Sequence, residues 1–169
     1  AYGVLFMNIF WIVLDGMRNI IDNNQRSPVE ILKNNKKDEK AVLFENVYTP
    51  GSSTAQTWLS ILYCEPSFYL AEDYATAKIS EDKKSLVSIL KEKGYESSFF
   101  IGAEGVFSRI AIPPFNNIAE YKTLTIPDNK IVEQFCNYNS KSQNKRFSVC
   151  HLIEPDKYEE HLEMIHNSF

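Results

Sequence analysis

Residues 8–18 read NIFWIVLDGMR, and this stretch decides the expected fold. Branched and aromatic side chains fill nearly every position up to Leu14, which is typical of a strand covered on both faces in a parallel sheet. The apolar run ends abruptly at Asp15-Gly16. The pattern therefore predicts a buried strand with a carboxylate at its carboxyl end.

Further apolar runs alternate with segments of helical periodicity along the rest of the chain. We predict strands at 42–48, 95–101 and 147–153, and helices after Ser27, after the Pro50-Gly51 turn, from a Ser80 cap to Gly94, from Asp128 to Tyr138 and from Tyr158 to Ile165. Strands that alternate with helices indicate an α/β fold with a largely parallel sheet and helices on both faces. The expected organisation is one α/β domain over residues 1–169.

Composition limits the classes of partner. The chain has 169 residues, 44% of them apolar, which suits one globular domain. A formal net charge of -4 gives no general attraction to a polyphosphate backbone, so nucleic acid is not an expected partner. The apolar run from Val4 to Leu14 is shorter than the roughly 20 residues of a membrane span, and no basic region precedes it as in a signal peptide. The compartment stays open.

Two residues at predicted strand ends could carry chemistry. Asp15 could bind a hard cation, or it could simply cap the turn that follows. Thr54 stands near a predicted helix start, where unpaired N–H groups favour anions, and its hydroxyl could attack a phosphoryl or sulfuryl centre. The alternative is that residues 52–54 only supply an N-cap. Because carboxyl ends of parallel strands share one edge, we expect the side-chain oxygens of Asp15 and Thr54 to lie within about 5 Å of each other.

Other polar residues receive structural interpretations. His161 and His166 are five positions apart, which does not place them squarely on one helix face, and we interpret both as solvated. Cys150 and His151 are neighbours in a predicted strand and should point to opposite faces, so a catalytic Cys-His pair is not expected.

Four segments, in this order, resemble the start of the sulfatase-like and alkaline phosphatase superfamily. They are residues 8–18, residues 44–67 (FENVYTPGSSTAQTWLSILYCEPS), residues 85–102 (SLVSILKEKGYESSFFIG) and residues 146–165 (RFSVCHLIEPDKYEEHLEMI). The Asp-Gly pair is similar to the phosphodiesterase branch, and the Thr-rich turn to phosphoethanolamine transferases. The resemblance implies an alkaline-phosphatase-like fold in which Asp15 binds a metal, Thr54 is the nucleophile and also a metal ligand, and His151 faces the substrate.

The same resemblance implies a function. The chain would be a metal-dependent hydrolase or phosphotransferase that acts on phosphate or sulfate esters, with Zn, Mn, Mg or Ca as the divalent ion. The substrate would be a small-molecule, lipid or glycan ester.

The chain also departs from the family pattern. A Thr at position 54 cannot become the formylglycine of true sulfatases, which disfavours sulfate-ester hydrolysis. The family's Thr-Gly turn after the nucleophile helix is here Tyr63-Cys64. The family's later Asp-His pair and final His would follow the strand near His151, so we expect this chain to be the amino-terminal portion of a larger catalytic domain, and the fold to be incomplete. The alternative is a catalytically incomplete α/β binding or structural module, and whether the chain is an enzyme stays open at this point.

Overall fold

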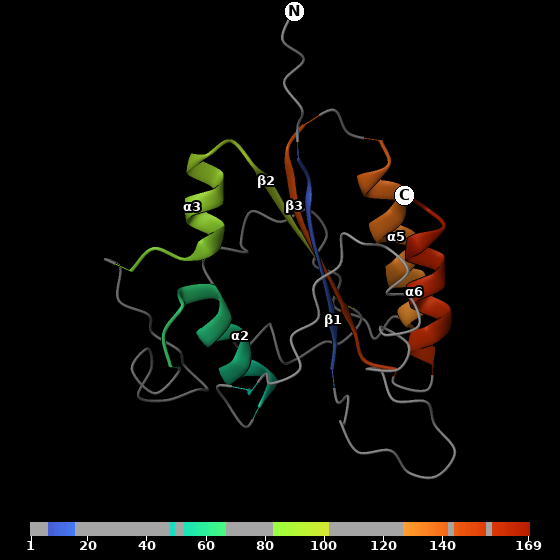
Figure 1. Ribbon diagram of the computed structural model, residues 1–169, viewed down its shortest axis with the longest axis horizontal. Helices are drawn as coiled ribbons and strands as arrows, with labels where there is room; N and C mark the ends of the chain where they lie inside the picture. The colour runs from blue at the N-terminus through green and yellow to red at the C-terminus, as the bar shows by residue number, and fades with distance from the viewer. Residues whose placement is uncertain are drawn as a thin grey trace, which may run out of the picture.

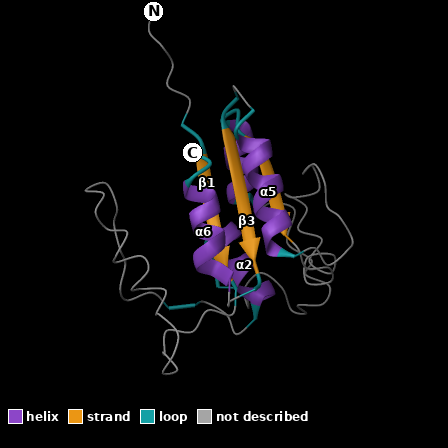
Figure 2. Ribbon diagram, turned by 90° about the vertical axis from the view of Figure 1, so that its right-hand side faces the viewer, coloured by secondary structure: helices purple, strands orange, loops and turns teal. Residues whose placement is uncertain are grey.

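The computed structural model describes seven ranges of the chain: residues 7–15, 48–49, 53–66, 83–101, 127–141, 144–154 and 157–169. Three strands form the described sheet: β1 (Ile9–Leu14), β2 (Glu96–Ile101) and β3 (Arg146–Leu152). Their order is β1-β3-β2, and both pairings are parallel. Figure 2 shows the strands running in one direction, so their carboxyl ends lie at one edge of the sheet.

Helices cover both faces of this sheet (Figure 1). One face carries α2 (Thr54–Tyr63) and α3 (Leu86–Glu92), and the other carries α5 (Asp128–Asn139) and α6 (Tyr158–His166). The predicted α/β fold with a parallel sheet between two helical layers is therefore confirmed. None of the described helices is long and apolar enough to span a membrane.

The first helical layer packs on alternate side chains of the strands, those that point to one face of the sheet. Trp58, Leu59 and Leu62 of α2 join Phe147 and Val149 of β3 in one buried cluster. The indole of Trp58 meets the Phe99 ring edge-on, with ring centroids 5.3 Å apart. Each fully buried apolar side chain of this size contributes roughly 1.5–3 kcal/mol, so this cluster anchors α2 firmly on the sheet.

The second helical layer packs on the intervening side chains of the same strands, which point to the opposite face of the sheet. Ile131, Val132 and Phe135 of α5 pack against Cys150 and Leu152 of β3. Successive strand residues point to opposite faces, which explains why Cys150 and His151 belong to different layers, as the sequence predicted.

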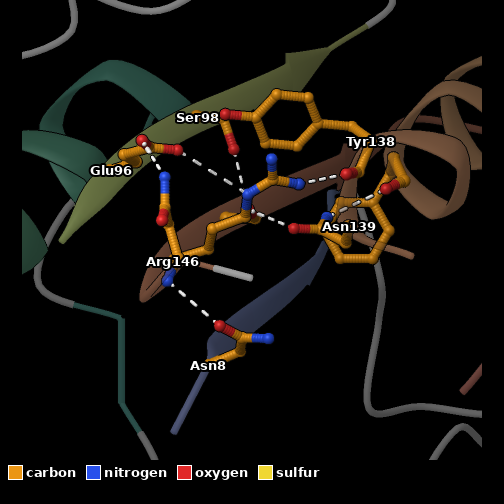
Figure 3. A network of polar contacts seen from close by, with 9 residues as sticks. Asn8, Glu96, Ser98, Tyr138, Asn139 and Arg146 are labelled. Carbon is orange, nitrogen blue, oxygen red and sulfur yellow. Dashed lines mark hydrogen bonds and ion pairs between the residues drawn. The ribbon is translucent and has the colours of Figure 1, made fainter. Parts of the chain in front are cut away.

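Arg146 is the centre of a network of polar contacts at the edge of the sheet where the strands begin (Figure 3). The Arg146 backbone N–H donates to Asn8 Oδ1 at 3.0 Å, which ties the start of β3 to the residue before β1. The guanidinium donates to the Tyr138 carbonyl, stacks over the Tyr138 ring at 3.8 Å and lies 3.8 Å from a Glu96 carboxylate oxygen. Arg146 therefore joins both outer strands and α5 at this edge.

A chain of hydroxyl contacts continues this network inward. Ser148 Oγ donates to Asn139 Oδ1 at 2.8 Å, so its one proton is used there. Ser98 Oγ, 2.7 Å from Ser148 Oγ, is then the donor between them. These buried polar groups satisfy one another between two strands and a helix.

The structure corrects one predicted helix start, and several other predictions fall on residues that it does not describe. The helix that ends before Gly94 begins at Leu86, and its cap is Ser85, whose Oγ accepts from Ser88 N at 3.1 Å. Ser85 stands directly before the apolar stripe, whereas Ser80 lies outside the described residues. Outside them too lie the helix predicted after Ser27 and the strand predicted at 42–48, except for its last residue.

Candidate functional site

Thr54 is the first residue of α2, and its neighbour takes the capping role. Ser53 has extended backbone geometry, and its Oγ accepts from Gln56 N at 3.3 Å, while its carbonyl accepts from Thr57 N at 3.0 Å. Ser53 is therefore the N-cap. The Thr54 hydroxyl is therefore not needed as a cap. It lies at the end of the helix where backbone N–H groups and the helix dipole favour an anion.

The Thr54 hydroxyl is directed at Asp15. Thr54 Oγ1 donates to Asp15 Oδ2 at 2.9 Å across 39 positions of sequence. Asp15 directly follows β1, and its N–H donates to Leu152 O at 2.9 Å, which keeps it in line with the neighbouring strand. The predicted proximity of the two side chains is confirmed. Their predicted roles, as metal ligand and nucleophile, stay predictions.

His151 lies beside the same carboxylate. Its Nε2 is 3.4 Å from Asp15 Oδ2, and its ring packs near the ring of Trp58 with centroids 5.7 Å apart. The side chain is only 1% exposed. Burial lowers the pKa of His151 below its ordinary value of 6.5, and the Asp15 charge only partly opposes that effect. At neutral pH the site therefore combines a carboxylate, a hydroxyl and a neutral imidazole.

The oxygen atoms of Asp15 and Thr54 are of the kind that hard divalent cations prefer. They are adjacent and partly exposed, so they fit as part of a metal site. Within the described ranges, however, no group of three or more His, Cys, Asp or Glu side chains is arranged to hold a metal ion. A complete site would need ligands from residues beyond these ranges.

Sequence reasoning missed a set of polar residues behind the site. The Tyr158 hydroxyl lies 2.5 Å from Asp15 O and 2.9 Å from Leu152 O. Asp128, fully buried at the start of α5, accepts from the N–H groups of Ile153 and Glu154 at 2.7 Å each. The turn after β3 is thus held by side chains from both helices of the second layer.

The prediction that His161 is solvated is wrong. His161 is fully buried, and its Nδ1 is 4.0 Å from Asp128 Oδ2. Residues 158, 161 and 165 share one face of α6 that packs inward, and helical spacing from Tyr158 would have identified His161 as part of that face. His166 is exposed, as predicted.

Comparison with known proteins agrees with this geometry. The family model described as Sulfatase matches residues 7–163. No curated protein and no solved structure shows significant similarity to the chain. The match covers every described strand and both residues of the Thr54–Asp15 hydrogen bond, and the parallel α/β sheet is that of an alkaline-phosphatase-like fold. The chain therefore belongs to the sulfatase family.

Proposed function

We propose that this chain carries the nucleophile of a metal-dependent hydrolase or transferase of phosphate esters, and that the nucleophile is Thr54. The observation that carries the proposal is the 2.9 Å hydrogen bond from Thr54 Oγ1 to Asp15 Oδ2 at the start of α2. Family membership supports hydrolase or transferase chemistry in general. The substrate class follows from the nucleophile, because a threonine cannot provide the formylglycine of true sulfatases.

In the proposed reaction Thr54 Oγ1 attacks the phosphorus atom in line with the ester oxygen. A bond forms between Oγ1 and phosphorus while the hydroxyl proton is lost to solvent, the ester P–O bond breaks, and the leaving oxygen takes up a proton and departs as the alcohol. Water, or a second alcohol in a transferase, then attacks the phosphorylated threonine; the bond between Oγ1 and phosphorus breaks, the phosphate product leaves, and Oγ1 regains a proton. Before attack, Asp15 Oδ2 holds the hydroxyl proton on the side away from the ester and orients the oxygen lone pairs.

The start of α2 also suits an anionic substrate. The first N–H groups of α2 lack intrahelical acceptors, and with the helix dipole they favour a bound phosphoryl group. The imidazole of His151 lies beside Asp15 and is neutral at pH 7, so it is a polar neighbour of the carboxylate and adds no charge to the site. The substrate-facing role predicted for His151 stays a prediction, and the contact of this buried side chain with Asp15 also suits a role through that carboxylate.

A divalent cation fits this chemistry. Asp15 and Thr54 would hold it together with residues outside the described ranges, and it would lower the pKa of the attacking hydroxyl and neutralise charge on the transferred group. We propose a small-molecule, lipid or glycan phosphoester as the substrate.

The test uses the Thr54→Ala and Thr54→Ser variants of the full protein. Turnover of nitrophenyl phosphate mono- and diesters and of nitrophenyl sulfate is measured with Zn, Mn, Mg or Ca, together with the intact mass after acid quench. We expect phosphoester turnover and a phosphorylated species in the wild type, loss of both in Thr54→Ala, and partial recovery in Thr54→Ser, because serine restores the hydroxyl.

Thr57→Ala is the matched control. Thr57 lies one helical turn on, and its Oγ1 contacts Thr49 Oγ1 at 3.0 Å rather than Asp15. It should keep wild-type turnover. Normal turnover in Thr54→Ala would reject Thr54 as the nucleophile, and absence of turnover in the wild type with every metal and ester would favour a binding or structural module.

A further inference from the structure

We propose that Tyr158 is a positioning residue that fixes the backbone of Asp15 and thereby the direction of its carboxylate. The geometric part of this inference concerns the strand ends alone. Its catalytic consequence rests on the proposed function.

Four hydrogen-bonding groups meet at the carboxyl ends of β1 and β3. The Asp15 N–H donates to Leu152 O at 2.9 Å, and the Tyr158 hydroxyl lies within 2.5 Å of Asp15 O and 2.9 Å of Leu152 O. Both sides of the Asp15 residue, its N–H and its carbonyl, are thus held. A residue fixed on both sides has little freedom in the direction of its Cα–Cβ bond, so the carboxylate position follows from the backbone.

The hydroxyl of Tyr158 does more than its ring. The ring packs in the buried cluster of the second layer, and a phenylalanine would pack there equally well. The hydroxyl has one proton, which it shares between the carbonyl oxygens of Asp15 and Leu152, and this shared hydrogen bond links the two strand ends.

The position of Tyr158 is itself well determined. Asp128 accepts from the N–H groups of Ile153 and Glu154, which fixes the chain as it leaves β3 toward α6. Tyr158 is the first residue of α6 and is 3% exposed. The second helical layer therefore holds the Asp15 backbone from the face of the sheet opposite to Thr54.

The test is the Tyr158→Phe variant of the full protein, which keeps the packing and removes only the hydroxyl. The first readout is amide hydrogen exchange at Asp15, with the Val149 amide in the middle of β3 as an internal reference. Loss of the hydroxyl should speed exchange at Asp15 by roughly 5- to 10-fold while Val149 stays unchanged. The second readout is kcat and KM for the phosphoester used with Thr54. We expect kcat per folded molecule to fall by about 10- to 100-fold, with little change in KM.

Tyr138→Phe is the control. Tyr138 belongs to the same helical layer but lies at the amino edge, where its ring packs on Arg146, so both readouts should match the wild type. Unchanged Asp15 exchange and unchanged kcat in Tyr158→Phe would overturn the inference and leave the proposed function standing. Equal acceleration at Asp15 and Val149 would show a general loss of stability and would also overturn it. A wild type without Thr54-dependent turnover would overturn the proposed function instead, and exchange at Asp15 would still decide whether Tyr158 fixes that backbone.

Discussion

Replacing Cys64 by glycine should stabilise the protein, because Cys64 ends α2 in a strained backbone conformation. Its φ of 55° and ψ of 30° lie in the left-handed region. A residue with a Cβ pays about 1–2 kcal/mol there, since the Cβ crowds the following carbonyl oxygen. Glycine escapes that cost but gains freedom in the unfolded chain worth about 0.4–1 kcal/mol. The free energy of unfolding should therefore rise by about 0.5–1 kcal/mol.

Little else is lost in this substitution. The Cys64 side chain is exposed, and its Sγ lies 3.9 Å from the Ile61 carbonyl oxygen, which is a weak contact. For a chain of this size each kcal/mol shifts Tm by about 2–4 °C, so Tm should rise by roughly 1–4 °C. The assay is thermal unfolding under reducing conditions, supported by denaturant unfolding to check that the slope is unchanged.

Two variants separate backbone strain from the chemistry of the thiol. Cys64→Ala removes the sulfur but keeps the Cβ, and should match the wild type. Gly94→Ala adds a Cβ at φ +81°, where, apart from Gly94 and its neighbours in sequence, no atom of the described residues lies within 4 Å of the new carbon, so backbone strain alone should lower stability. The reasoning is refuted if Cys64→Gly lowers Tm, or if Cys64→Ala raises Tm as much as Cys64→Gly does.

The remaining predictions concern the second helical layer. Asp128→Ala should lower the free energy of unfolding by about 3 kcal/mol, because the N–H groups of Ile153 and Glu154 lose a charged acceptor; denaturant unfolding measures this, and a change below about 1 kcal/mol would contradict it. Burial raises the pKa of the Cys150 thiol above its ordinary value of 9.0. Above pH 9.0 the thiol therefore ionises in the unfolded chain before it ionises in the folded protein, which favours unfolding. The contribution of Cys150 to the free energy of unfolding is complete below pH 9.0 and is lost as the pH rises above it. Cys150→Ala should therefore show a shallower alkaline loss of stability than the wild type, and an identical slope would show that Cys150 is not responsible.

Much of the fold follows from local sequence patterns. The continuous apolar run before Asp15 and the stripe before Gly94 identify a buried strand and an amphipathic helix without knowledge of their partners. The strand order β1-β3-β2 does not follow in this way, because β3, the last described strand in sequence, lies between β1 and β2. Pairing between residues so far apart is decided by packing of the whole molecule.

The residues of the candidate site also fall into two groups, those that local sequence patterns predict and those that only the fold identifies. Asp15 and Thr54 could be predicted because each follows a recognisable local signal, a strand end and a helix start. Tyr158, Asp128 and His161 could not be assigned to the site from such signals, because their importance depends on which backbone groups the fold brings to them. A buried tyrosine at a helix start has the same local pattern whether or not its hydroxyl meets a strand end.

The meeting of Asp15, His151 and Thr54 depends on one register. In the β1–β3 ladder Val13 pairs with His151, so Asp15, two residues on, points to the same face, which α2 covers. A slip of one residue would turn Asp15 toward α5 and remove the carboxylate from Thr54. The strand before Asp15 is apolar on both faces, so its hydrophobic pattern would tolerate that slip. The directional polar contacts at the two strand ends, Asn8 with the Arg146 N–H and Tyr158 with the last carbonyls, would not. Specificity of the site geometry therefore resides in these polar contacts, while the apolar interior supplies the stability.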